Sequence, residues 1–190
     1  MRAFFLLIVF AFSANAEVPE QARKLVAAAQ AQIGVTTSYN PAYVSLAFPG
    51  GDVPADRGVC TDVVIRAFRK LGMDLQKLVH EDMKGSFSKY PQNWGLKKPD
   101  PNIDHRRVPN LMRYFQRQGK SLPVTDKPAD YRPGDLVTCI VPPNLPHIMI
   151  VSDVPSPEDA VRMKVIHNIG AGARLEDRLF EFKLTGHYRW

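Results

Sequence analysis

Three side chains able to take part in nucleophilic catalysis occur along the chain in the order cysteine, histidine, histidine. Cys60 opens an apolar pattern typical of a helix, and His147 and His167 border apolar runs typical of strands. A thiol in the first turn of a helix feels the partial positive charge of unpaired backbone N–H groups, which favours the thiolate. An imidazole close to it would complete a nucleophile–base pair. The order therefore predicts a thiol hydrolase with Cys60 as nucleophile and His147 as base.

The local pattern around Cys60 fits equally a small core residue, because buried cysteines are common. The histidines favour the nucleophile. His147 shares a strand face with Met149 and Val151, so its side chain points toward a core or a cleft. Either His167 or Asn168 can fix the tautomer of His147, and we favour His167 because it ends the apolar run of the next strand. Asn168 is then a candidate for binding substrate.

A second candidate segment is Asp104-His105-Arg106-Arg107. Two adjacent arginines can grip a carboxylate through paired hydrogen bonds, so all four residues are predicted to bind substrate. The alternative is an ion-paired loop that holds the proline-rich middle of the chain together. Tyr39 and Tyr43 can line the cleft or simply pack, and His80 and His187 are expected to be ordinary residues.

Zinc binding and a disulfide are alternatives for the same side chains. Cys60, Cys139, His147 and His167 are acceptable zinc ligands, but the chain has no Cys-x-x-Cys or His-x-x-x-His pair. We therefore expect neither a metal nor another cofactor. The two cysteines could pair in an oxidising compartment, although Cys139 lies in an apolar strand pattern where a buried free thiol is ordinary.

The elements that must position these residues follow an α+β order. Helical spacing predicts helices over residues 20–33, 60–71 and 111–118, with an ordered loop over 36–58 and no regular element between 80 and 109. Strands are predicted over 136–141, 148–152 and 161–167, and a last pair over 179–184 and 187–190. Helices that precede antiparallel strands form an α+β domain, here a single one over residues 17–190.

The N-terminus has the features of a signal peptide. Arg2 precedes an apolar run over residues 3–12, and Ala14-Asn15-Ala16 matches the spacing that signal peptidase accepts. The run is shorter than the roughly 20 residues of a membrane-spanning helix, which disfavours the alternative of a membrane anchor. We expect a mature chain from Glu17 in the periplasm or outside the cell, with no stable membrane insertion. The net charge of +6 forms no long Lys/Arg stripe with aromatic residues, so a nucleic-acid partner is not expected.

Four stretches carry a resemblance to a known family: residues 58–64, 104–110, 132–137 and 167–170. On these the sequence resembles the family catalogued as domain of unknown function 1287. The order of Cys60, His147 and His167 is similar to that of the NlpC/p60-type cysteine peptidases, which are papain-like. That resemblance implies a papain-like fold, these three residues as the catalytic triad, and cleavage of an amide in peptidoglycan stem peptides. The hydrolases commonly carry Asp-Cys-Ser-Gly, whereas this chain has Val59-Cys60-Thr61-Asp62.

The sequence thus predicts an exported cysteine hydrolase that acts on peptidoglycan or a related peptide. The competing hypothesis is a non-catalytic periplasmic module that binds cell-wall peptides on the same fold.

Overall fold

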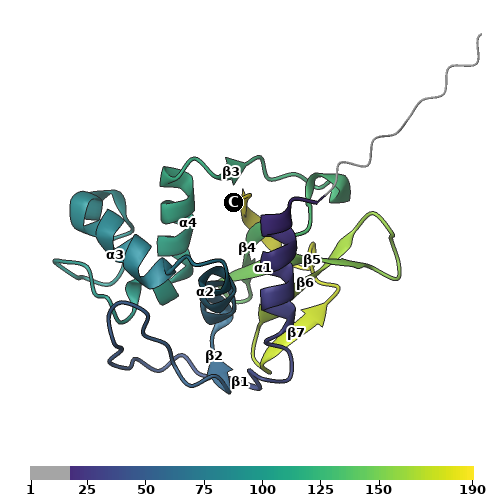
Figure 1. The fold of residues 1–190 in the computed structure, drawn as a ribbon. Helices are drawn as coiled ribbons and strands as arrows, with labels where there is room; N and C mark the ends of the chain where they lie inside the picture. Colours follow the sequence, from purple (N-terminus) through teal and green to yellow (C-terminus); the bar gives the residue numbers. More distant parts are fainter. Residues whose placement is uncertain (1–17) are drawn as a thin grey trace, which may run out of the picture.

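The computed structural model describes residues 18–190, which form four α-helices and a six-stranded antiparallel sheet (Figure 1). The helices are α1 (Glu20–Gln30), α2 (Cys60–Lys70), α3 (Leu75–Ser86) and α4 (Val108–Arg117). The strands of the sheet are β3 (Ser121–Leu122), β4 (Leu136–Val141), β5 (Leu145–Pro155), β6 (Met163–Asn168), β7 (Ala173–Glu176) and β8 (Lys183–Tyr188). The α+β class predicted from the sequence is confirmed.

Helix α2 lies at the centre of the helical layer. Figure 1 shows α1 beside it, and α2 also contacts α3 and strands β5 and β6. Eight of its first nine residues, Cys60 through Phe68 without Arg66, are buried, so the buried side chains cover every face of the helix. A helix that is enclosed on all sides positions its first residue rigidly, which matters because that residue is Cys60.

The sheet has the strand order β3-β8-β4-β5-β6-β7. Strands β5, β6 and β7 are consecutive neighbours, so residues from all three lie side by side on one face. A separate pair of two-residue strands, β1 (Ser38–Tyr39) and β2 (Arg57–Gly58), runs parallel just before α2. This pair brings residue 39 next to the segment that leads into Cys60.

Two hydrophobic clusters lie on the two faces of the sheet. Ile148, Ile150 and Ile166 pack with the helices in the larger cluster, which includes Cys60. Met149 and Val165 belong to the smaller cluster on the opposite face. Neighbouring strand residues point to opposite faces, so each cluster takes every second residue of β5 and β6.

The predicted elements agree with the structure in order and differ in detail. The first two helices are confirmed, the third begins at Val108, and Leu136–Val141 is confirmed as a strand. Helix α3 and strand β7 were not predicted. The expected last pair of strands was wrong, because one strand, Lys183–Tyr188, pairs with β4 across that stretch. Leu179 precedes it in a loop and packs into the smaller cluster, which explains the apolar pattern there.

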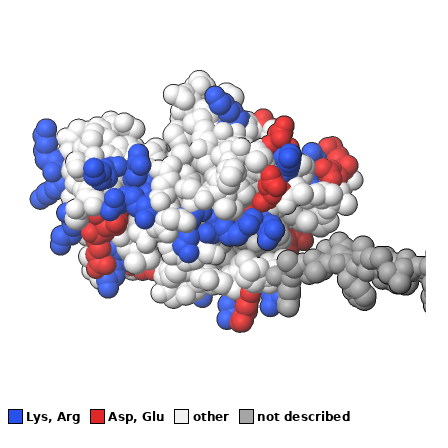
Figure 2. All heavy atoms as spheres, turned by 90° about the horizontal axis from the view of Figure 1, so that it is seen from above, with Lys and Arg blue, Asp and Glu red and all other residues white. Residues whose placement is uncertain are grey.

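Charged side chains are dispersed over the surface. In the view of Figure 2, Lys and Arg form separate groups, with Asp and Glu beside several of them. Ion pairs account for part of this, among them Arg117 with Asp82 and Arg162 with Asp177. Within residues 18–190, no helix is long and apolar enough to span a membrane. The predicted signal peptide, residues 1–16, lies outside the described residues.

Candidate active site

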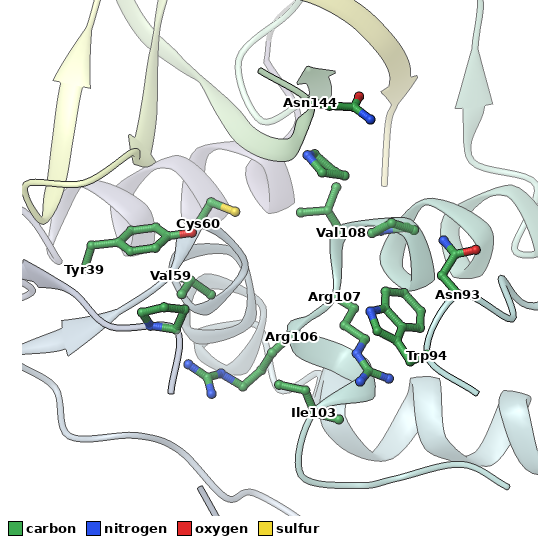
Figure 3. A pocket seen from close by; sticks show the side chains of 13 residues that line it. Tyr39, Val59, Cys60, Asn93, Trp94, Ile103, Arg106, Arg107, Val108 and Asn144 are labelled. Atoms are coloured by element: carbon green, nitrogen blue, oxygen red, sulfur yellow. The ribbon is translucent and has the colours of Figure 1, made fainter. Parts of the chain in front are cut away.

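Cys60 is the first residue of α2, and its sulfur points into a pocket of about 450 Å³ (Figure 3). The first N–H groups of a helix have no partner within the helix, so those at Cys60 and Thr61 are available to a ligand. Amides in this position can stabilise an oxyanion formed at a carbon that the thiolate attacks. The pocket is therefore the place where a substrate would meet the thiol.

Asp62 and Arg106 clamp the start of α2. One oxygen of Asp62 accepts from the backbone N–H of Val59 at 2.6 Å, and Arg106 donates to both carboxylate oxygens at 2.9 and 3.0 Å. A Cβ at Gly58 would lie 2.9 Å from Oδ2 of Asp62, so glycine is required for the carboxylate to fold back. The Thr61 hydroxyl donates to the backbone oxygen of Arg106. Asp62, which departs from the usual hydrolase motif, thus serves to hold the segment around Cys60.

The resting thiol is protonated at neutral pH. Burial raises the pKa of Cys60 to about 11, and the negative charge of Asp62 adds to that effect. The backbone N–H groups of Ile148 and Thr61 act in the opposite direction and do not outweigh it. The thiolate expected from the helix start alone therefore requires a base that accepts the proton.

His147, His167 and Glu176 form a hydrogen-bonded chain across β5, β6 and β7. The distance from His147 Nε2 to His167 Nδ1 is 2.8 Å, and from His167 Nε2 to Glu176 Oε2 it is 2.9 Å. A carboxylate only accepts, so His167 donates through Nε2 and, as a neutral imidazole, accepts at Nδ1. His147 must then donate through Nε2, and its Nδ1 keeps a free lone pair. The chain fixes His147 in the tautomer that a general base needs.

Burial also keeps His147 neutral. It lowers the pKa of His147 to about 3, with a further contribution from His167. For His167, burial lowers the pKa and the neighbouring Glu176 only partly offsets this. Both imidazoles are therefore neutral at pH 7, which agrees with the tautomers assigned above.

The thiol and His147 approach the sheet from different faces. Strand alternation puts His147 on the face of Met149, as predicted, whereas Cys60 packs with Ile148 and Ile150. The N–H of Ile148, the residue after His147, is nonetheless near the sulfur. Among the hydrogen bonds of residues 18–190, none joins Cys60 to either histidine. The start of β5 therefore connects the two groups, since His147 is followed there by the residue whose N–H lies near the sulfur.

The four-residue segment predicted to bind substrate divides in two. Asp104 and His105 are buried, and burial lowers the pKa of His105 to about 3. The side chain of Arg106 is only 2% exposed and is committed to Asp62, as in the ion-paired alternative. Arg107 lines the pocket with a side chain that is 17% exposed. The geometry thus favours Arg107 among the four as a residue that can contact a ligand.

Asn168 joins three segments around the site. Its amide nitrogen donates to the backbone oxygens of Ser38 and Gly58, and its amide oxygen accepts from the N–H groups of Gly170 and Gly172. These contacts connect the end of β6 to the β1–β2 pair in front of Cys60. The side chain of Asn168, which was predicted to bind substrate, thus makes four hydrogen bonds within the protein that hold the segment before Cys60.

The pocket wall contains one of the two tyrosines considered from the sequence, together with residues that the sequence did not indicate. Tyr39 lines the pocket, and burial raises its pKa to about 12, whereas Tyr43 bonds to Asp100 and Asn102 outside the lining. Trp94 and Asn144 also line it, from loops whose course no local pattern reveals. Glu176 was missed as well. Its only signal was a position two residues beyond the partner of His167 in a short strand that was not predicted.

The structure bears on the two alternatives considered for the cysteines, a disulfide and a zinc site. Cys60 and Cys139 are both free thiols, and they belong to the clusters on opposite faces of the sheet. Among the described residues, no three His, Cys, Asp or Glu side chains are grouped closely enough to hold a metal ion. The four candidate zinc ligands are therefore not gathered as a set.

Comparison with known proteins identifies the family. The model of a family described as a domain of unknown function, DUF1287, matches residues 26–190. The chain belongs to the DUF1287 family. It is 56% identical over 162 residues to the uncharacterized protein YijF of Escherichia coli K12, a match that covers 85% of this chain and 78% of that relative. No solved structure matches significantly.

The DUF1287 match covers every residue of the site described above. It includes Cys60 and the whole of the His147–His167–Glu176 chain. It also includes Arg107 in the pocket wall. A function for this site must therefore be argued from its chemistry.

Proposed function

We propose that this DUF1287 protein is a cysteine hydrolase that cleaves an amide bond, with Cys60 as nucleophile, His147 as general base and His167 as the residue that orients it. The observation that carries the proposal is the hydrogen-bonded chain from Glu176 through His167 to His147, which fixes the tautomer of His147 and leaves its Nδ1 unprotonated. The residue before His147, Pro146, lines the pocket that contains the Cys60 thiol.

The reaction proceeds in two steps. His147 Nδ1 takes the proton of Cys60 as the sulfur attacks the amide carbon, and the N–H groups at the start of α2 stabilise the oxyanion. The imidazolium then gives its proton to the leaving amine, which produces a thioester. In the second step His147 takes a proton from water, and the hydroxide releases the acid product from Cys60. Glu176 and His167 stabilise the positive charge that His147 carries between the two proton transfers.

Because Cys60 and His147 are both neutral at rest, the proposal is for general-base catalysis and not for a preformed thiolate–imidazolium pair. The proposal requires the start of β5 to move when substrate binds, so that Nδ1 of His147 reaches the Cys60 sulfur. Catalytic hydrogen bonds are often long in the absence of substrate and form on binding.

The finer assignments belong to the same proposal. The order of a nucleophile helix followed by strands with two histidines supports a papain-like, NlpC-type fold. The N-terminal apolar run and Ala14-Asn15-Ala16 support export to the periplasm, where peptidoglycan stem peptides are the available amide substrates.

Incubation of the mature protein with purified peptidoglycan fragments tests the function. Mass spectrometry should detect products shortened by cleavage of one peptide bond, and Cys60→Ala should produce none. Cys139→Ala is the matched control, because it removes the thiol on the opposite face of the sheet and should still cleave. Fragments that remain intact with the wild-type protein, yet bind to it, would support the non-catalytic module instead.

A further inference from the structure

The charged part of the pocket wall consists of two arginines with different availability. Arg106 and Arg107 are the charged residues among those that line it, and no acidic side chain does so. Arg106 uses Nε and Nη2 on Asp62 and Nη1 on the backbone oxygen of Ala42. The side chain of Arg107 makes one hydrogen bond within residues 18–190, from Nη1 to Asp104 at 3.1 Å. Its Nε and Nη2 remain available to a ligand.

The guanidinium of Arg107 is held in a fixed plane. It lies 4.0 Å from the ring centroid of Trp94, and Asp104 holds it through Nη1. Asp104 is itself buried and accepts from the backbone N–H of Asp100 at 2.6 Å, so the tether cannot swing away. A guanidinium that is stacked and tethered loses little freedom when it binds a planar anion.

We propose that Arg107 is a specificity-determining residue that binds a carboxylate of the substrate. The inference rests on the proposed function for the role of Cys60, but the binding of a carboxylate does not require catalysis. One accessible guanidinium suits a monoanionic carboxylate. A phosphate dianion would call for a second accessible cation, and Arg106 is enclosed.

The location of Arg107 indicates which carboxylate it binds. Figure 3 shows Cys60 and Tyr39 on one wall of the pocket and Arg107 with Trp94 on another, with Val108 between them. The carboxylate therefore belongs to a residue beside the amide that Cys60 attacks, either an acidic side chain or a free C-terminus. Neutral peptides of the same length would lack this contact.

Thiol-directed labels of increasing length test the proposal without turnover. The probes are bromoacetyl conjugates of glycine, β-alanine and 4-aminobutyrate, each compared with its own carboxamide. For one length, the carboxylate should label Cys60 about tenfold faster than the amide, since a charge-assisted contact adds affinity of that order. In Arg107→Gln the carboxylate and the amide of each length should label Cys60 at about the same rate.

Arg113→Gln is the matched control. Arg113 lies on α4, the helix that follows Arg107, but does not line the pocket, so this variant removes one positive charge and should retain the preference. A preference for carboxylate that persists in Arg107→Gln, or that is absent at every length in the wild-type protein, would overturn the proposal.

A binding measurement separates this proposal from the role of Cys60. The indole ¹⁵N–H signal of Trp94 is followed by NMR during titration with N-acetylglycylglycine and with its amide. A shift that saturates only with the acid, and is lost in Arg107→Gln, supports the carboxylate site even if no reagent labels Cys60. Equal shifts with acid and amide would refute it, even if Cys60 proves to be the nucleophile.

Discussion

The two halves of the sheet each contain a buried histidine that bonds to a carboxylate, and they differ in what the second ring nitrogen faces. In the β5–β7 half, His167 donates to Glu176 through Nε2 and accepts from His147 at Nδ1, so Nδ1 of His147 keeps a free lone pair. In the β4–β8 half, His187 faces Asp135 at 2.7 Å and the backbone oxygen of Pro123 at 3.2 Å. Each nitrogen of His187 therefore faces an oxygen of the protein, and His187 does not line the pocket that contains Cys60.

The two histidine groups also differ in their surroundings. His187 stacks on Tyr131, and Asp135 also binds Arg189, so every group in that half has a structural partner. In the other half, the residues on either side of His147 reach the site: Pro146 lines the pocket, and the N–H of Ile148 lies near the Cys60 sulfur. A buried histidine–carboxylate pair is therefore not in itself a sign of catalysis, because the group at its outer end decides what it can do.

Substitution of the two histidines should separate the halves most strongly. His147→Ala removes the base, and general-base catalysis contributes about 10²–10⁴-fold, so the rate of amide cleavage should fall by that factor. His187→Gln should leave the rate per folded molecule within about twofold, because its nitrogens do not face the pocket. Turnover of wall fragments, normalised to the folded fraction by circular dichroism, measures both. Equal losses in the two variants would remove the distinction.

The buried arginines should also differ, this time in stability. Arg106→Ala leaves the carboxylate of Asp62 buried without its partner, which costs about 3–5 kcal/mol in the free energy of unfolding. Arg189→Ala should cost about 1 kcal/mol or less, because Arg189 is 35% exposed and Asp135 keeps His187. Urea denaturation gives both values. The double variant Asp62→Leu/Arg106→Met is the control, and it should be more stable than Arg106→Ala alone.

The two halves should lose stability in different pH ranges. The folded-state pKa of His147 is about 3, below its ordinary value of 6.5, so the unfolded chain binds a proton first as the pH falls. The stability that the neutral imidazole contributes is complete above about pH 6.5 and declines toward pH 3, by up to about 1.4 kcal/mol per pH unit.

Asp135 responds at lower pH. Burial would raise the pKa of its carboxyl, but hydrogen bonds from His187 and Arg189 outweigh this and hold it below the usual range. Its contribution is therefore present above about pH 3.9 and is lost as the pH falls further. In urea titrations, His147→Gln should flatten the decline between pH 6.5 and 4, and Asp135→Asn only the part below about pH 4. An exchange of these two ranges would contradict the assignment.

Glu176→Gln should have the smallest effect. The amide oxygen of glutamine can still accept from His167 Nε2, so the tautomers are retained and only the charge that stabilises imidazolium is lost. We expect the rate of amide cleavage to fall about three- to tenfold. Glu20→Gln, which removes an exposed acid that pairs with Lys24, is the control and should not change the rate. A loss as large as that of His147→Ala would mean that Glu176 takes part in proton transfer directly.

The sequence predicted the parts of this fold that depend on local pattern. The helix that begins at Cys60 and the strand Leu136–Val141 follow from apolar spacing, and the pairing of His147 with His167 follows from neighbouring strands. Helix α3 was missed although it has a local signal, because Leu75, Val79 and Met83 follow helical spacing and Asp74 caps the first turn.

The candidate site divides in the same way. Cys60, His147 and His167 could be selected by type and order, whereas the roles of Asp62 and Arg106 depend on a contact between residues 44 positions apart. The same holds for Trp94 beneath Arg107, since an exposed loop tryptophan has no local signature. The pKa of Cys60 could not be inferred either, because the helix start predicts a lower value and burial of the thiol raises it.

The rate at which iodoacetamide alkylates Cys60 at pH 7.5 tests the central claim most directly. Burial alone would make this thiol slower than an exposed reference cysteine, so rapid labelling requires a base at the sulfur. We predict that Cys60 reacts at least as fast as the reference, that His147→Ala slows it by about tenfold or more, and that His187→Gln does not. Slow labelling of Cys60 that is the same in all three proteins would contradict the account.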